Sequence, residues 1–238
     1  MTKSYKTDGN NQVIFSEDMK LAELIDADYN LLSILLRFDM ELPFGDISVA
    51  EMCRRYGISP SLFLMICQIC SQPDYHPDYK ELKAEDDIVN LIKYLKASHR
   101  YYTQILLPRI VKGVEDMLHD CEDKQRNILS KFCADYVNEV RAHLEYEECE
   151  IFPYIESLMR GEQCCSEIGI YMDSHTDICE KIDDMKSIMI KYLPVACPMR
   201  QRCELLFDIF ALREDLARHT LLEIEVLAPL VKCKEKRV

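Results

Sequence analysis

Four histidines are spaced along the chain so that they could bind metal together: His99, His143, His175 and His219. The first two are 44 residues apart, and so are the last two. His143 is followed four residues later by Glu147. His219 is followed at the same distance by Glu223. Residues four apart lie one turn apart on one face of an α-helix, so each histidine shares a face with its glutamate. The same pattern, a lone histidine followed by a His-x-x-x-Glu pair, occurs twice along the chain.

Imidazole and carboxylate groups in this number indicate a site for two metal ions. Six protein ligands exceed the four that a structural zinc ion uses. Two ions that share the set would each take two histidines, with Glu147 and Glu223 as bridges and one position left open. Such a site suits iron, with manganese and zinc as alternatives. The predicted ligands are His99, His143, Glu147, His175, His219 and Glu223. Any one of these histidines could instead be a hydrogen-bonded core residue, but the repetition favours a site.

Long helices must position these side chains. Sustained helical periodicity predicts four segments, joined by short breaks: Ala84–Leu118, Lys124–Leu158, Gly161–Leu193 and Met199–Lys232. His99 and His143 are equally distant from the first break, and His175 and His219 are equally distant from the last. Short connections between long amphipathic helices favour antiparallel neighbours. The sequence therefore predicts an all-α protein with an up-down-up-down four-helix bundle, in which each helix contributes one histidine at a common level.

A smaller helical region precedes the predicted bundle. Short helical patterns cover residues 16–27, 30–38, 49–56 and 60–70, and a polar, proline-containing segment at 71–80 follows them. We expect a small N-terminal domain over residues 1–75, a linker over 76–84 and the bundle over 85–238. The N-terminal region has the length of a helix-turn-helix, but residues 1–75 carry 6 basic and 11 acidic side chains. A docking or dimerisation module is favoured over DNA binding, which needs positive charge.

The composition excludes several other classes of protein. The chain has 238 residues, 48% hydrophobic residues and a formal net charge of −13. The apolar content is too high for disorder, and the acidic balance argues against nucleic-acid and anionic membrane partners. No apolar stretch is long enough to span a bilayer, and the first residues lack the apolar segment of a signal peptide. We expect a cytoplasmic protein whose twelve cysteines are free thiols.

Some other reactive side chains lie near or outside the predicted site. Tyr102 shares a helix face with His99, so it could line the site. His119 is out of phase with His99, and His76 falls in the predicted linker. Cys67 and Cys70 form a Cys-x-x-Cys pair, but zinc would need two further ligands. The adjacent pair that follows a glycine-containing turn is expected to be more exposed: Cys164 and Cys165.

Four stretches resemble the hemerythrin-like HHE cation-binding family, and in particular its iron–sulfur cluster repair di-iron proteins: SHRYYTQILLPRI, HLEYEECEIFP, MDSHTDICEKI and ARHTLLEIEVLAP. The resemblance covers about residues 85 to 232, and the adjacent Glu147 and Glu148 match it. It implies that the six predicted ligands hold two non-haem iron ions with an oxo or hydroxo bridge. It also implies repair or protection of iron–sulfur centres under oxidative or nitrosative stress, with O2 or NO as ligands and damaged iron–sulfur proteins as partners.

The sequence departs from the repair proteins in two places. Leu221 stands where a second histidine is common in the last helix. The N-terminal region has Leu42, Pro43, Phe44 and Gly45 where the repair proteins carry a Cys-Cys-Gly-Gly turn, and only Cys53 matches a later family cysteine. A second hypothesis is therefore reversible O2 binding or O2/NO sensing, and a third is a metal-free bundle with a partner module. Enzymatic activity and a homodimer stay open.

Overall fold

The computed structural model describes residues 13–82, 85–119, 121–162, 176–192 and 198–235. Within these ranges the regular secondary structure is helical, apart from isolated β-bridge residues such as the antiparallel pair Lys20 and Ser48. The all-α prediction is confirmed. The chain divides into two compact units, of which the first combines Met1–Ala97 with Leu222–Cys233 and the second combines Ser98–Leu221 with Lys234–Val238. The first break in this division falls inside a helix, downstream of the predicted linker at 76–84.

The N-terminal part of the first unit consists of short helices. These are α1 (Leu21–Ala27), η1 (Tyr29–Leu31), α2 (Leu32–Arg37), α3 (Val49–Tyr56), α4 (Pro60–Ser71) and η2 (Tyr79–Glu81). Ser48 forms a capping box with Glu51 at the start of α3. Ser59 caps α4, where Pro60 occupies the first turn as predicted. These caps satisfy backbone N–H groups that the first turn of a helix leaves without partners.

The first predicted helix begins later than its sequence pattern indicates. The pattern places the start at Ser16, whereas α1 begins at Leu21. The backbone N–H of Leu21 donates to the carbonyl of Ile47, and that of Val49 donates to the carbonyl of Met19. The residues directly before α1 are therefore tied by backbone hydrogen bonds to the segment before α3, a contact that local propensity does not reveal.

Three of the four predicted long helices are present, and each contains a short π-helical segment. The first comprises α5 (Glu85–Tyr101), η3 (Tyr102–Leu106) and α6 (Leu107–Leu118). The second comprises α7 (Asp123–Tyr146), η4 (Glu147–Ile151) and α8 (Phe152–Met159). The last comprises α10 (Met199–Leu221), η6 (Leu222–Leu227) and α11 (Ala228–Glu235). Their ends agree closely with the ends predicted from periodicity.

The third predicted helix is shorter in the described residues, where α9 covers Thr176–Lys191. The predicted start at Gly161 is wrong, because Gly161 has a φ of +76° and terminates α8. The N–H of Glu162 donates back to the carbonyl of Ser157, which is typical of a glycine-terminated helix end. Residues 163–175, and with them the predicted ligand His175, lie outside the described residues.

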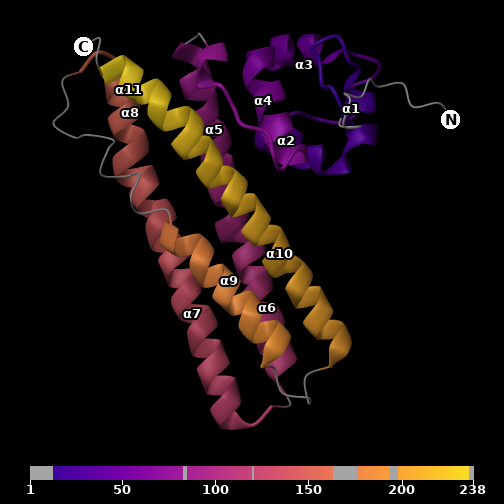
Figure 1. The fold of residues 1–238 in the computed structure, drawn as a ribbon, viewed down its shortest axis with the longest axis vertical. Coiled ribbons are helices and arrows are strands. Elements are labelled where there is room, and N and C mark those ends of the chain that lie inside the picture. The colour runs from indigo at the N-terminus through magenta and orange to yellow at the C-terminus, as the bar shows by residue number, and fades with distance from the viewer. Residues whose placement is uncertain (1–12, 83–84, 120, 163–175, 193–197, 236–238) are drawn as a thin grey trace. The chain divides into compact units, whose positions relative to one another are not determined.

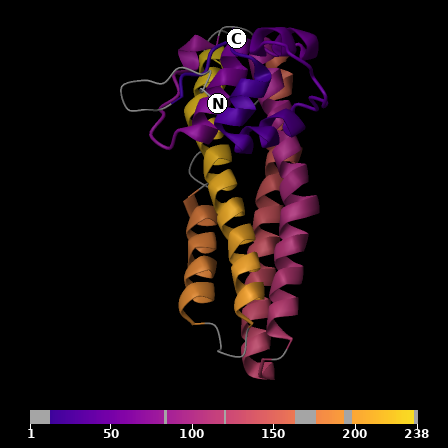
Figure 2. The same ribbon diagram turned by 90° about the vertical axis from the view of Figure 1, so that its right-hand side faces the viewer.

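In the second unit, α6 packs against α7 and α10, and α9 packs against the same two helices. Figures 1 and 2 show these four helices running lengthwise beside one another. Their shared core includes Tyr102, Val140, Met185 and Leu212. The up-down-up-down connectivity stays a prediction, because two of the connecting segments, 163–175 and 193–197, lie outside the described residues. None of the described helices is long and apolar enough to cross a membrane.

Candidate metal centre

The π-helical segments coincide with the predicted ligands. Glu147 is the first residue of η4, Glu223 lies in η6, and His99 lies three residues before η3. Each segment ends two residues before a proline, at Pro108, Pro153 and Pro229. Proline has no N–H to donate, and its ring clashes with the carbonyl four residues earlier in an α-helix. A wider π turn accommodates this, and such segments occur frequently at functional sites.

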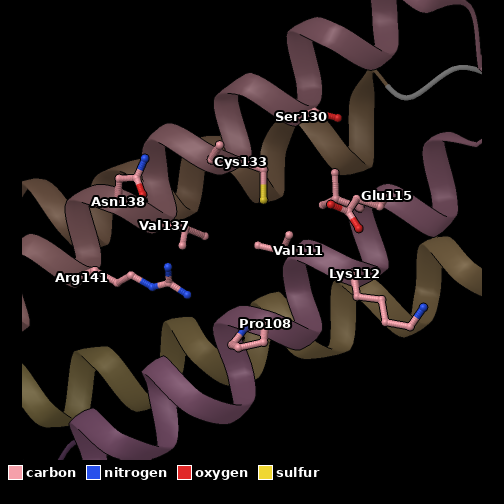
Figure 3. Close-up of a pocket in the computed structure, with 11 residues that line it drawn as sticks. Pro108, Val111, Lys112, Glu115, Ser130, Cys133, Val137, Asn138 and Arg141 are labelled. Atoms are coloured by element: carbon pink, nitrogen blue, oxygen red, sulfur yellow. The ribbon is translucent and has the colours of Figure 1, made fainter.

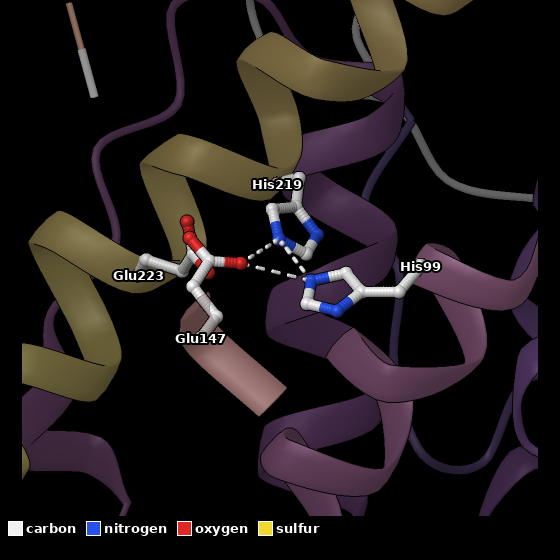
Figure 4. A group of neighbouring side chains, drawn as sticks. All are labelled: His99, Glu147, His219 and Glu223. Atoms are coloured by element: carbon white, nitrogen blue, oxygen red, sulfur yellow. Dashed lines mark hydrogen bonds and ion pairs between the residues drawn. The ribbon is translucent and has the colours of Figure 1, made fainter. Parts of the chain in front are cut away.

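Four of the six predicted ligands converge from these helices. One ligand atom each from His99, Glu147, His219 and Glu223 lies within 4.8 Å of the others. The Nε2 atom of His99 is 3.1 Å from Nε2 of His219 and 3.0 Å from Oε2 of Glu147. Figure 4 shows both imidazoles and the Glu147 carboxylate pointing toward one another, with Glu223 one turn beyond His219 on the same helix.

The converging groups are buried. The exposed fraction is 0% for Glu147, 1% for His99 and Glu223, and 4% for His219. Two carboxylates withdrawn from water carry a desolvation cost of several kcal/mol each unless opposite charge compensates them. A cation bound between the imidazole nitrogens and carboxylate oxygens would supply that charge, and this mixed donor set suits iron, manganese or zinc. The residues present therefore fit a metal ion.

His143, the fifth predicted ligand, adjoins the same cluster. Its Nε2 atom is 2.6 Å from Oε1 of Glu147, while Oε2 of that glutamate faces His99. The two carboxylate oxygens thus face different histidines, which is the arrangement expected of a bridging ligand. The side chain of His143 is 13% exposed, so it lies on the side of the cluster nearest to solvent. His175, the sixth, lies outside the described residues.

Three neighbouring side chains orient and enclose the histidines. The carboxylate of Glu148 lies 3.0 Å from Nδ1 of His99, so it holds the ring with Nε2 toward the cluster. The ring of Phe152 stacks on His99 at 5.5 Å between centroids. The buried ring of Tyr102 meets His219 edge-on at 5.8 Å. Tyr102 thus contacts one of the predicted ligands and also belongs to the buried core.

The contacts of Glu148 and Phe152 with His99 were not predicted from the sequence. Glu148 could have been recognised because it directly follows the predicted ligand Glu147. The adjacent glutamates match the family resemblance, but the sequence does not show what the second one contacts. For Phe152 the signal was weaker, because five residues separate it from Glu147 and would place the two on different faces of a regular α-helix.

The two remaining histidines, His76 and His119, are not part of this cluster, as predicted. His119 is exposed at the end of α6, and His76 is exposed in the segment before η2. Burial raises the pKa of the Cys67 thiol well above its usual value, so this side chain stays neutral and is a poor nucleophile. Cys70 is also buried. The adjacent pair Cys164 and Cys165 lies outside the described residues.

A helical chain with a buried cluster of histidines and glutamates defines a class of cation-binding helical proteins. A comparison with protein families makes the assignment specific. The family model for the hemerythrin HHE cation binding domain matches residues 90–231. This match covers more than half of the chain, and the chain belongs to this family. A search of curated proteins found no match to the chain.

Proposed function

We propose that this protein is a cytoplasmic non-haem di-iron protein that repairs or protects iron–sulfur centres under oxidative or nitrosative stress. The observation that carries the proposal is the buried convergence of His99, Glu147, His219 and Glu223 within 4.8 Å. Membership of the hemerythrin HHE family supports cation binding. The repair role rests on the resemblance of the HHE motifs to the repair proteins.

The proposed ligands are the six predicted from the sequence. Glu147 would bridge the two ions, because its oxygens face His143 on one side and His99 on the other. Glu223 would be its counterpart, because it holds the same place in the repeat, four residues after His219. The neutral imidazoles would add no charge to the site. The negative charge of the two carboxylates would offset part of the positive charge of the two ions.

Two iron ions would supply one-electron redox chemistry and an open coordination position for NO or O2. The chain's own residues prepare the site for them. Glu148 holds Nδ1 of His99 and thereby aims Nε2 inward. Phe152 and Tyr102 cover the two histidine rings and exclude water from that side. The partly exposed edge of His143 marks the side from which a small ligand could enter.

Reversible O2 binding is the second candidate, and the enclosure of the site favours it. The four converging side chains are at most 4% exposed, and aromatic rings cover both His99 and His219. Such enclosure would limit the access of protons from solvent to a ligand bound at the site. A reduced protein that forms a stable oxygenated absorbance in air would support this function, whereas prompt oxidation to a stable diferric form would support redox repair chemistry.

The site itself is tested by metal analysis of anaerobically purified protein. We expect about two irons per chain, as in two-metal sites generally, and a visible spectrum that changes on addition of NO. His219→Ala should lose at least one iron. His76→Ala is the matched control, because His76 is exposed and apart from the cluster. Unchanged iron content in His219→Ala would contradict the site assignment.

The repair role needs a separate assay. An iron–sulfur enzyme inactivated by NO should regain activity faster in the presence of the iron-loaded protein than with the His219→Ala variant. Equal recovery with both proteins would reject the repair role while leaving metal binding intact. We further propose that residues 1–75 form a docking module for the damaged protein or for a second copy of the chain, in keeping with their short capped helices and acidic balance.

A further inference from the structure

A groove on the second unit is not explained by the metal centre. It lies between α6 and α7 and has a volume of about 670 Å3, which is within the range of small-molecule sites. Its floor is apolar and includes Val111, Val114, Val137 and Cys133. Three of these side chains are nearly inaccessible, at 1% for Val114, 4% for Val137 and 2% for Cys133. No predicted metal ligand lines the groove (Figure 3).

The two ends of the groove differ in charge. Arg141 lies at one end, and Figure 3 shows its guanidinium turned into the groove beside Val137 and Pro108. Glu115 lies at the other end, seven residues beyond Pro108 and therefore about 10 Å farther along α6. Among the described residues, Arg141 has no hydrogen bond or ion pair with another side chain. Lys112 differs, because it is paired with Asp116 at 2.9 Å and points away from the floor in Figure 3.

We propose that this groove binds a linear monocarboxylate with an aliphatic body, such as a medium-chain fatty acid. The planar guanidinium of Arg141 matches a carboxylate and can donate two parallel hydrogen bonds to it. The hydrocarbon chain would lie along the valine floor and remove its own apolar surface from water. Glu115 at the far end would repel a second carboxylate, so the groove should select monoacids over diacids of the same length.

Cys133 keeps the floor uncharged. Burial raises the pKa of its thiol to about 11, with a smaller contribution from the negative charge of Glu115. The thiol is therefore protonated near neutral pH and behaves as a small hydrophobic group.

Binding of decanoate to the full-length, iron-loaded protein tests the proposal by isothermal titration calorimetry. Arg141→Gln should weaken binding by about tenfold or more, the effect of losing a charge-assisted carboxylate contact. Lys112→Gln is the matched control, because it removes a neighbouring positive charge that is already paired, and it should change affinity by less than about twofold. Decanol and decanedioate should each bind about tenfold more weakly than decanoate.

Several results would overturn the proposal. No heat of binding with decanoate at concentrations below micelle formation would do so. Equal affinity for decanol and decanoate, or for the wild-type protein and Arg141→Gln, would show that the contact is merely hydrophobic.

Discussion

At the residue scale, Glu147 is the side chain on which the candidate metal centre depends most. It is completely buried, and its two oxygens lie 2.6 Å from His143 and 3.0 Å from His99. A buried carboxylate in such a position is destabilising unless positive charge accompanies it. The binding of a cation between these groups would supply that charge and account for the placement of Glu147.

Replacing Glu147 by glutamine tests whether the charge of this side chain, and not its size, is needed for metal binding. Glu147→Gln keeps the size of the side chain but removes its charge, so the variant should lose at least half of its iron after anaerobic loading and desalting, since a bridging ligand contacts both ions. Iron per chain is measured by inductively coupled plasma analysis. Glu150→Gln, in the same π segment but exposed, is the control. Full iron occupancy in Glu147→Gln would refute its role as a bridge.

Glu148 would act on a bound metal ion through His99. Because its carboxylate accepts from Nδ1 of that ring, Glu148→Gln should leave the number of bound ions unchanged while lowering affinity by about 10- to 100-fold, the usual effect of losing a histidine's outer partner. A chelator competition titration measures this affinity, and the charge-transfer bands of the loaded protein should shift. Glu148→Asp should recover part of the loss. A variant with wild-type affinity and spectrum would exclude this positioning role.

At the element scale, the site was predictable where regular helical geometry applies. The spacing of His143 to Glu147 and of His219 to Glu223 requires only the α-helical repeat, and His99, Glu147, His219 and Glu223 do converge. The π segments were not predicted, because a helical pattern does not distinguish i+4 from i+5 hydrogen bonding. In a π turn a residue five positions along approaches the same face, which explains how Phe152 reaches His99 near Glu147.

The proline after each π segment provides a test of this geometry. Pro153→Ala restores an N–H that can donate within the helix and removes the ring clash, so the segment should relax toward a regular α-helix. We expect the metal-free variant to melt at the same or a higher temperature than wild type, and its iron affinity to fall by about tenfold or more, because Glu147 is displaced. Pro60→Ala, in the first turn of α4, is the control. Unchanged iron affinity would show that proline does not set the π geometry.

The close packing of α6 against α10 can also be tested by substitution. A Cβ atom added at Gly113 would lie 3.2 Å from Cδ1 of Leu205, which is too close for a branched side chain. Gly113→Val should therefore destabilise the protein by about 1–3 kcal/mol, measured by urea unfolding. In a Leu205→Ala background the same substitution should cost less, because the cavity accepts the added methyl groups. Equal costs in both backgrounds would exclude this steric contact as the cause.

At the scale of the whole molecule, composition predicted the all-helical class, but tertiary contacts set the division of the chain. The polar segment at 71–80 marks a linker by composition alone. The first unit nevertheless extends to Ala97, because the start of α5 is bonded to the N-terminal helices. Asn90 donates from its side chain to the carbonyl of Gly57 at 2.9 Å, and Ser59 donates to the carboxylate of Asp87. Local composition does not encode such partners.

Metal binding should also couple to the stability of the entire chain, because the candidate ligands among the described residues come from three long helices that are far apart in sequence. A metal ion that binds only the folded state stabilises it by about 4 kcal/mol at a thousand times its dissociation constant. Removing iron with a chelator should therefore lower the melting temperature measured by calorimetry. In His219→Ala, iron should raise the melting temperature by less than in the wild-type protein, because a site that lacks this ligand binds fewer ions. His76→Ala should keep the wild-type difference, since that side chain is exposed in the segment before η2. A melting temperature that iron does not change in the wild-type protein would mean that the buried carboxylates are compensated without a metal ion.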